Sequence, residues 1–526
     1  MKFEKALSAA ILLLFQLAFQ VSLAQEVMDK PNVILIMCDD LNDYQQIFGG
    51  HKQAITPNID RMAKSGVQFV NAQSNIPVCQ PSRNSLFTGV YPHRSKDYGW
   101  TNLRKQPVLK NNKTLMRLFQ ENGYKTLGTG KLTHGRSTAN WDKWGLNISH
   151  NYGPIYFNGE DLSANPSVPK PYRTIGPIDG SYGRLSDVGI SEGSTKGEKG
   201  WVYGRDKKPF RYINDNDRDL LQDELHARWA EKQLIDMNQS SSNQPFFMGI
   251  GFVRPHTPLH APDKYFDLFP IEELELSDWI PDDKKDTFWD ENFKQTNKGP
   301  RLYKTLLDSY DGNRELALKH FLQAYLACVA FVDDQIGYVL DALDNTRFKN
   351  NTIVILTSDH GWQMGEKEYL FKNSPWEEST RIPLVISSPS LINTGKVKHP
   401  VSLIDLYPTL MEVCKLEGDT TLNDQGGDLG GFSLLPFLLD PDTTKWEGPN
   451  GALSIIGNYG KTIPTEKQNF SYRTEKFRYI KYSDGSEELY DHEKDPYEWK
   501  NIAHKKSSKK IKAGLRSEME LIISTR

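Results

Sequence analysis

The chain has few cysteines and no closely spaced pair of them. Only four occur in 526 residues: Cys38, Cys79, Cys328 and Cys414. This excludes a C-x-x-C zinc site and a small fold that depends on many disulfides. Cys38 lies in an apolar run of strand length and Cys328 in a helical pattern, so we expect both to be core thiols.

An excess of charge of either sign is also missing. The 64 Lys and Arg residues nearly balance 67 Asp and Glu, giving a net charge of -3, or -4 without residues 1–24. Broad electrostatic binding of nucleic acid or an anionic membrane is therefore not expected, and any anion must be recognised locally. Repeats, heptads and low-complexity tracts do not stand out, and 38% hydrophobic residues are enough for a large core.

A single apolar stretch lies at the N-terminus. Residues 9–19 follow two lysines and precede Ser22 to Ala24, which offer small residues at a cleavage position. The stretch is short for a membrane span, and Gln16 and Gln20 interrupt the apolar pattern. We expect residues 1–24 to be a secretory signal, and the mature protein to be periplasmic or secreted with no membrane anchor.

Four apolar runs of strand length are each followed at once by reactive side chains. The runs are 32–37, 125–128, 245–253 and 352–356, and the side chains after them are Asp39 and Asp40, Lys131 and His134, Arg254 and His256, and Asp359 and His360. Continuous hydrophobicity indicates strands buried on both faces, and helical patterns between them, as at 115–119 and 321–332, indicate a largely parallel sheet. Because ligands of such sheets bind beyond the carboxyl ends of the strands, we expect these side chains to converge.

The pentapeptide Cys79-Gln80-Pro81-Ser82-Arg83 has a distinctive local chemistry. Pro81 suits the first position of a helix through Phe87, because that position leaves its amide hydrogen unpaired in any case. Residue 79 would then lie beside the positive helix start, which favours an anionic group or substrate. Arg83, one turn into the helix, would hold residue 79 or the substrate charge.

With these segments in view, the chain resembles the type I formylglycine-dependent sulfatases, and most closely their iduronate-2-sulfatase-like branch. The matching segments are 31–40, 56–60, 79–93 with the C-x-P-S-R signature, 128–134, 254–262, 358–361, 370–383 and 488–491. The resemblance implies an α/β, alkaline-phosphatase-like fold, with a large mostly parallel sheet flanked by helices and a smaller C-terminal subdomain containing an antiparallel sheet. It also implies hydrolysis of sulfate esters on a sulfated polysaccharide or its oligosaccharides, and ulvan, carrageenan and glycosaminoglycans all remain open.

The resemblance assigns roles to individual residues. Cys79 would be converted by a formylglycine-generating maturase to 3-oxoalanine (formylglycine), the nucleophile. One divalent cation, usually Ca²⁺, would be bound by Asp39, Asp40, Cys79, Asp359 and His360. Oxygen ligands fit calcium, but imidazole is uncommon on it, so whether His360 binds the metal or contacts the nucleophile stays open.

The basic residues would share the acid and base work. By the same resemblance, Arg83, Lys131 and Lys372 neutralise sulfate oxygens. His256, assisted by Lys372, protonates the departing sugar oxygen, and His134 then removes a proton from the second hydroxyl of residue 79 so that inorganic sulfate leaves.

The domain organisation is expected to be simple. The catalytic domain covers residues 25–430, and the C-terminal subdomain covers 431–526, with antiparallel strands at 470–473, 477–480 and 488–490 before a basic terminal helix. Residues 151–216 are dense in Gly, Pro, Tyr and charged residues, and we expect them to line a sugar cleft. The proposed contacts there are Trp201, Tyr203, Arg205 and Arg211.

Other functions remain to be separated from this one. A phosphonate or phosphodiester hydrolase of the same superfamily is one alternative, and a non-catalytic glycan-binding protein is another if Cys79 stays unmodified. Gly128-Thr129-Gly130 is compatible with nucleotide binding, but the Walker spacing is absent. A two-zinc phosphatase is disfavoured, because no histidine has an aspartate four positions before it.

Overall fold

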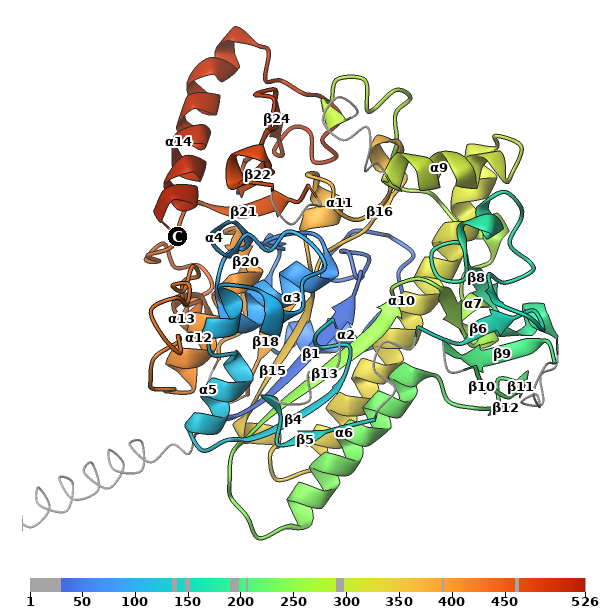
Figure 1. The fold of residues 1–526 in the computed structure, drawn as a ribbon, viewed down its shortest axis with the longest axis horizontal. Helices are drawn as coiled ribbons and strands as arrows, with labels where there is room; N and C mark the ends of the chain where they lie inside the picture. The colour runs from blue at the N-terminus through green and yellow to red at the C-terminus, as the bar shows by residue number, and fades with distance from the viewer. Residues whose placement is uncertain are drawn as a thin grey trace, which may run out of the picture.

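A large mixed sheet forms the centre of the protein. The computed structural model describes residues 30–134, 140–146, 152–189, 198–204, 207–289, 298–389, 392–458 and 463–525, so the expected signal segment 1–24 lies outside them. Eight strands follow the order β19-β2-β18-β15-β1-β13-β4-β5, of which those from β18 to β5 are labelled in Figure 1. In that order they are Gly395–Val397, Val67–Phe69, Leu384–Ser387, Thr352–Ser358, Asn32–Asp39, Phe246–Pro255, Lys125–Gly130 and Lys143–Trp144.

The strands at the centre of this sheet run parallel. β15, β1, β13, β4 and β5 pair in parallel, whereas β18 runs antiparallel to both β15 and β2. The predicted α/β fold with a mostly parallel sheet is confirmed. The antiparallel strand β18 was not expected.

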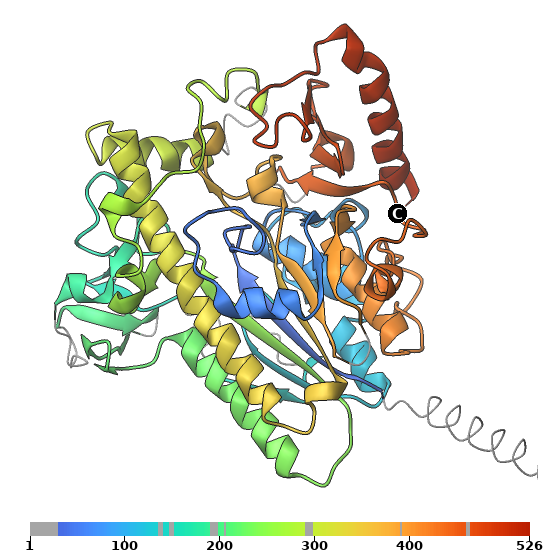
Figure 2. The same ribbon diagram turned by 180° about the vertical axis from the view of Figure 1, so that it is seen from behind.

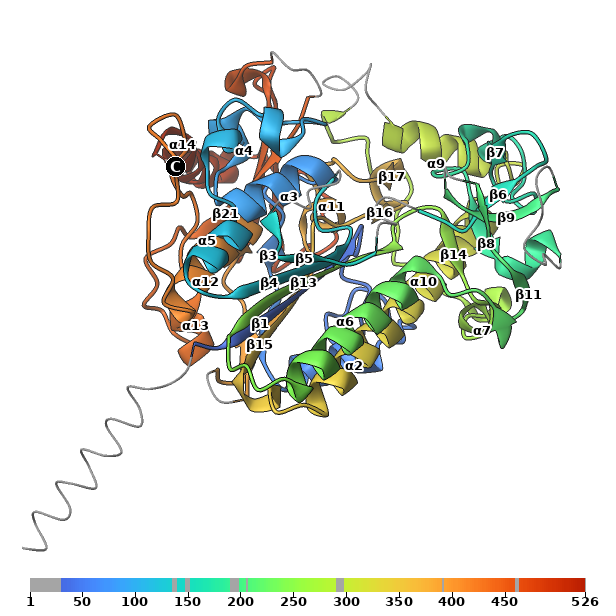
Figure 3. The same ribbon diagram turned by 60° about the horizontal axis from the view of Figure 1, so that its bottom comes forward.

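Strand β1 shows why the apolar runs are continuous. Ile34 and Ile36 pack into the hydrophobic cluster that includes α6 (Gln222–Gln239) and α10 (Arg314–Asp344). Val33 and Leu35 pack into a second cluster with α5 (Leu115–Glu121) and α12 (Leu406–Val413). Figure 3 shows these helices on opposite faces of the sheet. Alternate side chains are therefore buried on both sides, as the sequence predicts.

Helix α10 is the longest helix of the described chain. By length and composition it qualifies as a membrane span, but 78% of its apolar window is buried inside the protein. It lies along α6 across one face of the sheet (Figure 2). Asn313 caps its start by accepting a hydrogen bond from the Leu316 amide at 3.1 Å. α10 is thus a core helix.

Shorter elements complete the catalytic region. The helices are α2 (Pro57–Lys64), α3 (Cys79–Thr88), α4 (Pro92–Ser95), α7 (Asp263–Phe266), α9 (Lys298–Asp308), α11 (Glu377–Thr380) and α13 (Leu435–Leu439). The paired short strands are β3 (Ala72–Gln73) with β20 (Val401–Ser402), and β16 (Gln363–Met364) with β17 (Leu370–Phe371). All four cysteines are buried and free, as expected for Cys38 and Cys328.

The region after residue 151 forms small sheets beside α10. One contains β10 (Lys208–Pro209), β9 (Gly200–Tyr203), β6 (Ile155–Phe157) and β7 (Leu162–Ser163), and two more pair β11 (Tyr212–Asn214) with β12 (Asp217–Arg218), and β14 (Leu259–Ala261) with β8 (Tyr182–Arg184). The expectation that Trp201 contacts a sugar is wrong. Its side chain is 1% exposed, and its indole N–H donates to the Leu185 carbonyl at 2.7 Å.

The other three residues proposed to contact a sugar are Tyr203, Arg211 and Arg205. The Tyr203 hydroxyl donates to the Leu220 carbonyl at 2.7 Å, so its polar end is already satisfied. Arg211 forms an exposed ion pair with Asp217. Arg205 lies outside the described residues.

The C-terminal region contains a separate antiparallel sheet. Its strands follow chain order: β21 (Gly451–Ile456), β22 (Asn469–Thr474), β23 (Phe477–Lys481) and β24 (Glu487–Asp491), followed by α14 (Lys509–Thr525). The three predicted strands and the terminal helix are confirmed, and β21 is an additional strand. The domain boundary near residue 430 stays a prediction.

A buried ion cluster joins this sheet to the catalytic region. Arg478 of β23 is fully buried, and it pairs with Glu377 of α11 and, at 2.5 Å, with Glu498. Replacing Arg478 with Met should lower the free energy of unfolding by about 3–5 kcal/mol, because two buried carboxylates lose a cation. Urea unfolding measures this loss. Lys481→Ala on the same strand breaks only an exposed pair with Glu520 and should cost less than about 1 kcal/mol.

The same cluster predicts a dependence of stability on pH. Burial raises the pKa of Glu377, but Arg473 and Arg478 outweigh it and hold that pKa well below its usual range. Burial raises the pKa of Glu498, but Arg478 and His492 together outweigh it and lower that pKa. A depressed folded pKa contributes stability above the unfolded value and loses it as pH falls. From about pH 5 to pH 3, wild type should therefore lose stability more steeply than Arg478→Met. Parallel slopes in urea titrations would contradict this.

Candidate active site

Four neighbouring parallel strands bring their following residues to one edge of the sheet. Asp39 ends β1 and Asp40 follows it, Asp359 and His360 follow β15, Lys131 follows β4, and His256 follows the end of β13. Contacts among these residues, described below, show that they converge as expected. Asp40 has a φ of 63°, a left-handed conformation that aspartate tolerates better than most residues. The Tyr325 hydroxyl, which donates to its carbonyl at 2.8 Å, helps to fix this turn.

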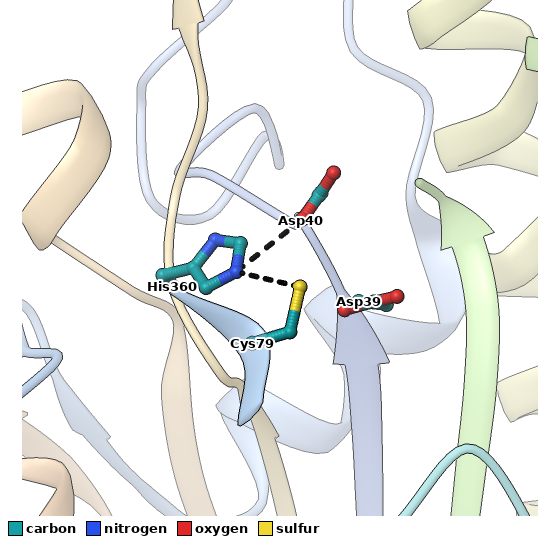
Figure 4. Close-up of side chains that lie close together, drawn as sticks. All are labelled: Asp39, Asp40, Cys79 and His360. Atoms are coloured by element: carbon teal, nitrogen blue, oxygen red, sulfur yellow. Dashed lines mark hydrogen bonds and ion pairs between the residues drawn. The ribbon is translucent and has the colours of Figure 1, made fainter. Parts of the chain in front are cut away.

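Cys79 is the first residue of α3. The helix begins two residues earlier than expected, with Val78 as its N-cap and Pro81 as its third residue. Proline fits there because the first four amides of a helix have no intrahelical partner. The Cys79 side chain is fully buried, and its Sγ lies 3.0 Å from Lys372 Nζ. It also lies 3.3 Å from His360 Nε2, a contact drawn in Figure 4.

The environment of Cys79 does not favour a thiolate. Burial and the nearby Asp39 together raise the pKa of its thiol to about 12, although Lys372 opposes the shift. Because the thiolate is the nucleophilic form of cysteine, an unmodified Cys79 is a weak nucleophile at neutral pH.

The two carboxylate oxygens of Asp40 have different surroundings. Its Oδ1 lies 2.6 Å from Lys372 Nζ and 3.4 Å from His360 Nε2. Its Oδ2 is buried without a hydrogen-bond partner among the described residues, and it lies 3.7 Å from His256 Nε2. Burial raises the pKa of Asp40 to about 7, although Lys372 lowers it. A buried carboxylate oxygen left without a partner is costly, and a bound cation would relieve that cost.

The donor set fits a divalent cation. One ligand atom each from Asp39, Asp40, Cys79 and His360 lies within 4.8 Å of all the others (Figure 4). His360 Nδ1 donates to the Gly361 carbonyl at 3.0 Å, which leaves the Nε2 lone pair directed at Cys79 and Asp40. This orientation suits a metal ligand and a nucleophile contact equally, so the two alternatives for His360 remain open.

Asp359 is positioned by hydrogen bonds beside this group. Its Oδ1 accepts from the amides of Asp40 and His360 at 3.3 and 3.1 Å, and its Oδ2 accepts from Arg83 Nε at 2.8 Å. Burial raises the pKa of Asp359 to about 6, while Arg83 lowers it. Asp359 thus orients the turns that carry Asp40 and His360, and its Oδ2 lies 3.7 Å from His360 Nε2.

Arg83 and Lys131 form ion pairs with the carboxylates of the site, Arg83 with Asp39 and Asp359, and Lys131 with Asp39. Arg83 is fully buried and spans Asp39 Oδ1 at 3.1 Å and Asp359 Oδ2 at 2.8 Å. Lys131 Nζ pairs with Asp39 Oδ2. Burial raises the pKa of Asp39, but Lys131, His256 and Arg83 together hold it well below its usual range. A direct contact of Arg83 or Lys131 with sulfate stays a prediction.

Tyr152 is a site residue that the motifs did not reveal. Its ring stacks on His256 with centroids 4.8 Å apart, and Lys131 Nζ lies 4.7 Å from its centroid. The Nδ1 of His256 donates to the Thr257 carbonyl at 2.5 Å, so Nε2 faces Asp40. Tyr152 therefore positions two predicted catalytic residues at once. Its sequence signal is weak, because it is one of many tyrosines in the 151–216 region expected to line a sugar cleft.

His134 lies farther out than the other predicted residues. It is half-buried against Trp100, with ring centroids 4.8 Å apart, and it lines a small cavity together with Arg83 and Asn102. Its expected role as a base toward residue 79 stays a prediction.

The arrangement combines a candidate cation site, the side chain of Cys79 at a helix start and two lysines that could neutralise an anion. Three buried carboxylates face Arg83, Lys131 and Lys372, so their charges balance before any ligand binds. If a cation and an anionic ester both bind, their charges largely cancel and the net charge of the site changes little. This is the chemistry of a metal-assisted hydrolase acting on an anionic ester.

Comparisons with known proteins agree with this site. The sulfatase family profile matches residues 31–416, and the profile described as N-sulphoglucosamine sulphohydrolase, C-terminal, matches 365–525. A sulfatase of Formosa agariphila is 33% identical over 504 residues, covering 93% of this chain and 86% of its own. Iduronate 2-sulfatase of Mus musculus is 30% identical over 363 residues, covering 69% of this chain and 60% of its own.

A solved structure shares the fold. A 2-O GAG sulfatase superposes with a TM-score of 0.64 at 21% identity, covering 94% of this chain and 92% of its own. Family profile, relatives and site geometry agree, and the chain therefore belongs to the sulfatase family and is a sulfuric ester hydrolase.

Proposed function

We propose that this sulfatase releases inorganic sulfate from a sulfated polysaccharide or its oligosaccharides, with Cys79 converted to formylglycine as the nucleophile. One observation carries the proposal: Cys79, in the C-x-P-S-R segment, lies at the start of α3 against Lys372 and His360, beside the unpaired oxygen of Asp40. A formylglycine-generating maturase is the implied partner, and a periplasmic or secreted location is part of the proposal.

The modification supplies what the thiol lacks. A hydrated aldehyde carries two hydroxyls on one carbon, so one can accept the sulfate group and the other can expel it. A divalent cation, proposed to be Ca²⁺ held by Asp39, Asp40, Asp359, His360 and residue 79, would favour ionisation of the attacking hydroxyl and neutralise sulfate charge.

The protein's own cations complete the site. Lys372 contacts both residue 79 and Asp40, so its ammonium is placed to neutralise charge where a sulfate group would meet residue 79. Lys131 is held by Asp39 and the Tyr152 ring. His256 presents Nε2 to the same space, where it would donate a proton to the leaving sugar oxygen. Arg83 keeps Asp39 and Asp359 in place.

A carbohydrate substrate is supported by the relatives. The names of mouse iduronate 2-sulfatase and of the structurally similar 2-O GAG sulfatase refer to sulfated sugars. Ulvan, carrageenan and glycosaminoglycan fragments are the classes to compare.

Parallel assays of aryl sulfate, phosphate diester, phosphonate ester and sulfated oligosaccharides test the proposal. We expect release of inorganic sulfate from the oligosaccharides, and preference for the sulfate ester over the phosphorus esters. Preference for a phosphorus ester would make the chain a phosphonate or phosphodiester hydrolase, and absence of all turnover in protein with formylglycine would contradict hydrolysis.

Asp40→Asn should remove bound cation and lower kcat/KM by at least about 10²-fold, because the unpaired carboxylate oxygen loses its charge. Elemental mass spectrometry and aryl sulfate turnover measure the two effects. Asp236→Asn is the control, since Asp236 is exposed and pairs only with Lys232 among its described contacts. Unchanged turnover in wild type whose metal content is verified as absent would contradict the metal proposal.

A further inference from the structure

Lys298 is a charged residue that neither the motifs nor the proposed chemistry uses, and it lies close to the site. The exposed fraction of the side chain is 0% for Asp40, 4% for Lys372, 9% for His256 and 31% for Lys298, so Lys298 is the most solvent-accessible of the four. A sugar whose sulfate group reaches residue 79 has to extend toward the exposed end of this series.

Lys298 is linked to Lys372 through one aromatic ring. Its Nζ lies 4.0 Å from the centroid of Phe371, and Lys372 Nζ lies 5.6 Å from the same centroid. The two ammonium groups are therefore less than about 10 Å apart. Neighbouring anionic substituents of one sugar or disaccharide can span such a separation.

A second series of contacts links Lys298 to His256. Lys298 Nζ pairs with Asp179 Oδ2 at 2.7 Å, and Asp179 Oδ1 accepts from the Thr257 hydroxyl at 3.2 Å. The Thr257 carbonyl accepts from His256 Nδ1 at 2.5 Å. Lys298 is thus fixed relative to both residues proposed to act at the leaving oxygen.

The position of Lys298 is not explained by the stability of its ion pair. The ion pair with Asp179 is about one third exposed, so it contributes little to stability. An ammonium has three donors, and within the described chain Asp179 is the one hydrogen-bond partner of Lys298 Nζ, which leaves donors for an anion from solvent.

We propose that Lys298 recognises a second anionic group on the substrate, beside the sulfate that is cleaved. The inference rests on the proposed function and narrows its substrate class to sulfated sugars with a further negative charge. A uronate carboxylate and a second sulfate have the same charge chemistry for an ammonium, and experiment must distinguish them.

Two pairs of substrates test this. One pair is a sulfated uronic acid disaccharide and its methyl ester, and the other is a disulfated disaccharide and its monosulfated counterpart. For the substrate that carries the recognised charge, Lys298→Gln should lower kcat/KM by roughly 10–100-fold, as expected for the loss of a charge-assisted hydrogen bond. The loss should be mostly in KM, and it should shrink at high salt. Lys298→Arg should retain most of the preference.

Turnover of 4-nitrophenyl sulfate is the internal control for folding and chemistry. It should be unchanged in Lys298→Gln, because this ester has no second charge. Lys304→Gln, which replaces an exposed lysine further along α9, should leave kcat/KM unchanged on both substrate pairs. If Lys298→Gln loses equal kcat/KM on the charged and neutral substrates of each pair, the inference is overturned. It is also overturned if wild type prefers neither charged substrate over its neutral counterpart. In both cases aryl sulfate turnover would still support the proposed function. Absence of turnover on every sulfate ester would overturn both.

Discussion

Cys79→Ala should reduce sulfate ester hydrolysis by about 10⁴–10⁶-fold, because it removes the nucleophile itself. Mass spectrometry of the wild-type peptide that contains residue 79 should show sulfur replaced by oxygen as an aldehyde. Cys414→Ala is the matched control, since Cys414 is equally buried but packs in the cluster on the opposite side of the sheet from α10. Its turnover should stay close to that of wild type.

The outcome separates the proposed enzyme from its alternatives. The buried Cys79 thiol has a pKa raised to about 12, so it has little capacity for nucleophilic attack without modification. Full activity in protein whose peptide contains only the thiol would overturn the formylglycine proposal. An unmodified peptide together with no turnover but retained glycan binding would indicate a binding protein.

The central fold was predictable because burial on both faces leaves a simple signal. Ile34 and Val33 are adjacent, yet they pack on opposite sides of the sheet, and a strand in that position must be apolar throughout. Strand β18 has the same apolar character, and hydrophobicity does not reveal whether a strand runs parallel or antiparallel. The start of α3 was misplaced because proline is tolerated at several positions in the first helical turn.

The site was predictable where residues directly follow strands. Asp39, Asp40, Asp359 and His360 are within a few residues of a strand end, so the sheet itself brings them together. Tyr152 and Lys298 arrive from connections whose path the apolar pattern does not constrain.

Trp201 shows the opposite error. Its place in a region dense in Gly, Pro, Tyr and charged residues indicated a sugar contact, but a hydrogen bond to Leu185 and a ring contact with His260 hold it in the interior. Composition does not show whether an aromatic residue faces solvent or the core.

His256→Ala should impair hydrolysis of glycan sulfates far more than hydrolysis of activated aryl sulfates. A sugar alkoxide leaves poorly without a proton, whereas an aryl oxide of low pKa hardly needs one, so the difference should approach the general-acid range of roughly 10²–10⁴-fold. The Thr257 carbonyl and the Tyr152 ring fix the imidazole with Nε2 directed toward the site. Burial, together with Lys372 and Lys131, lowers the pKa of His256 well below its usual range, so this role requires that Nε2 gain a proton when substrate binds. The kcat/KM values of wild type and His256→Ala on a glycan sulfate and on an aryl sulfate measure the difference.

His134→Ala provides the contrast, because its proposed action follows departure of the alcohol. This variant should accumulate enzyme sulfated at residue 79 with either substrate, which mass spectrometry detects directly. His320→Ala, which removes a ring stacked on Tyr310, should affect neither step. If His256→Ala loses equal activity on both substrates while binding is unchanged, His256 is not the leaving-group acid. Lys372, which contacts both residue 79 and Asp40, is then the better candidate for that proton.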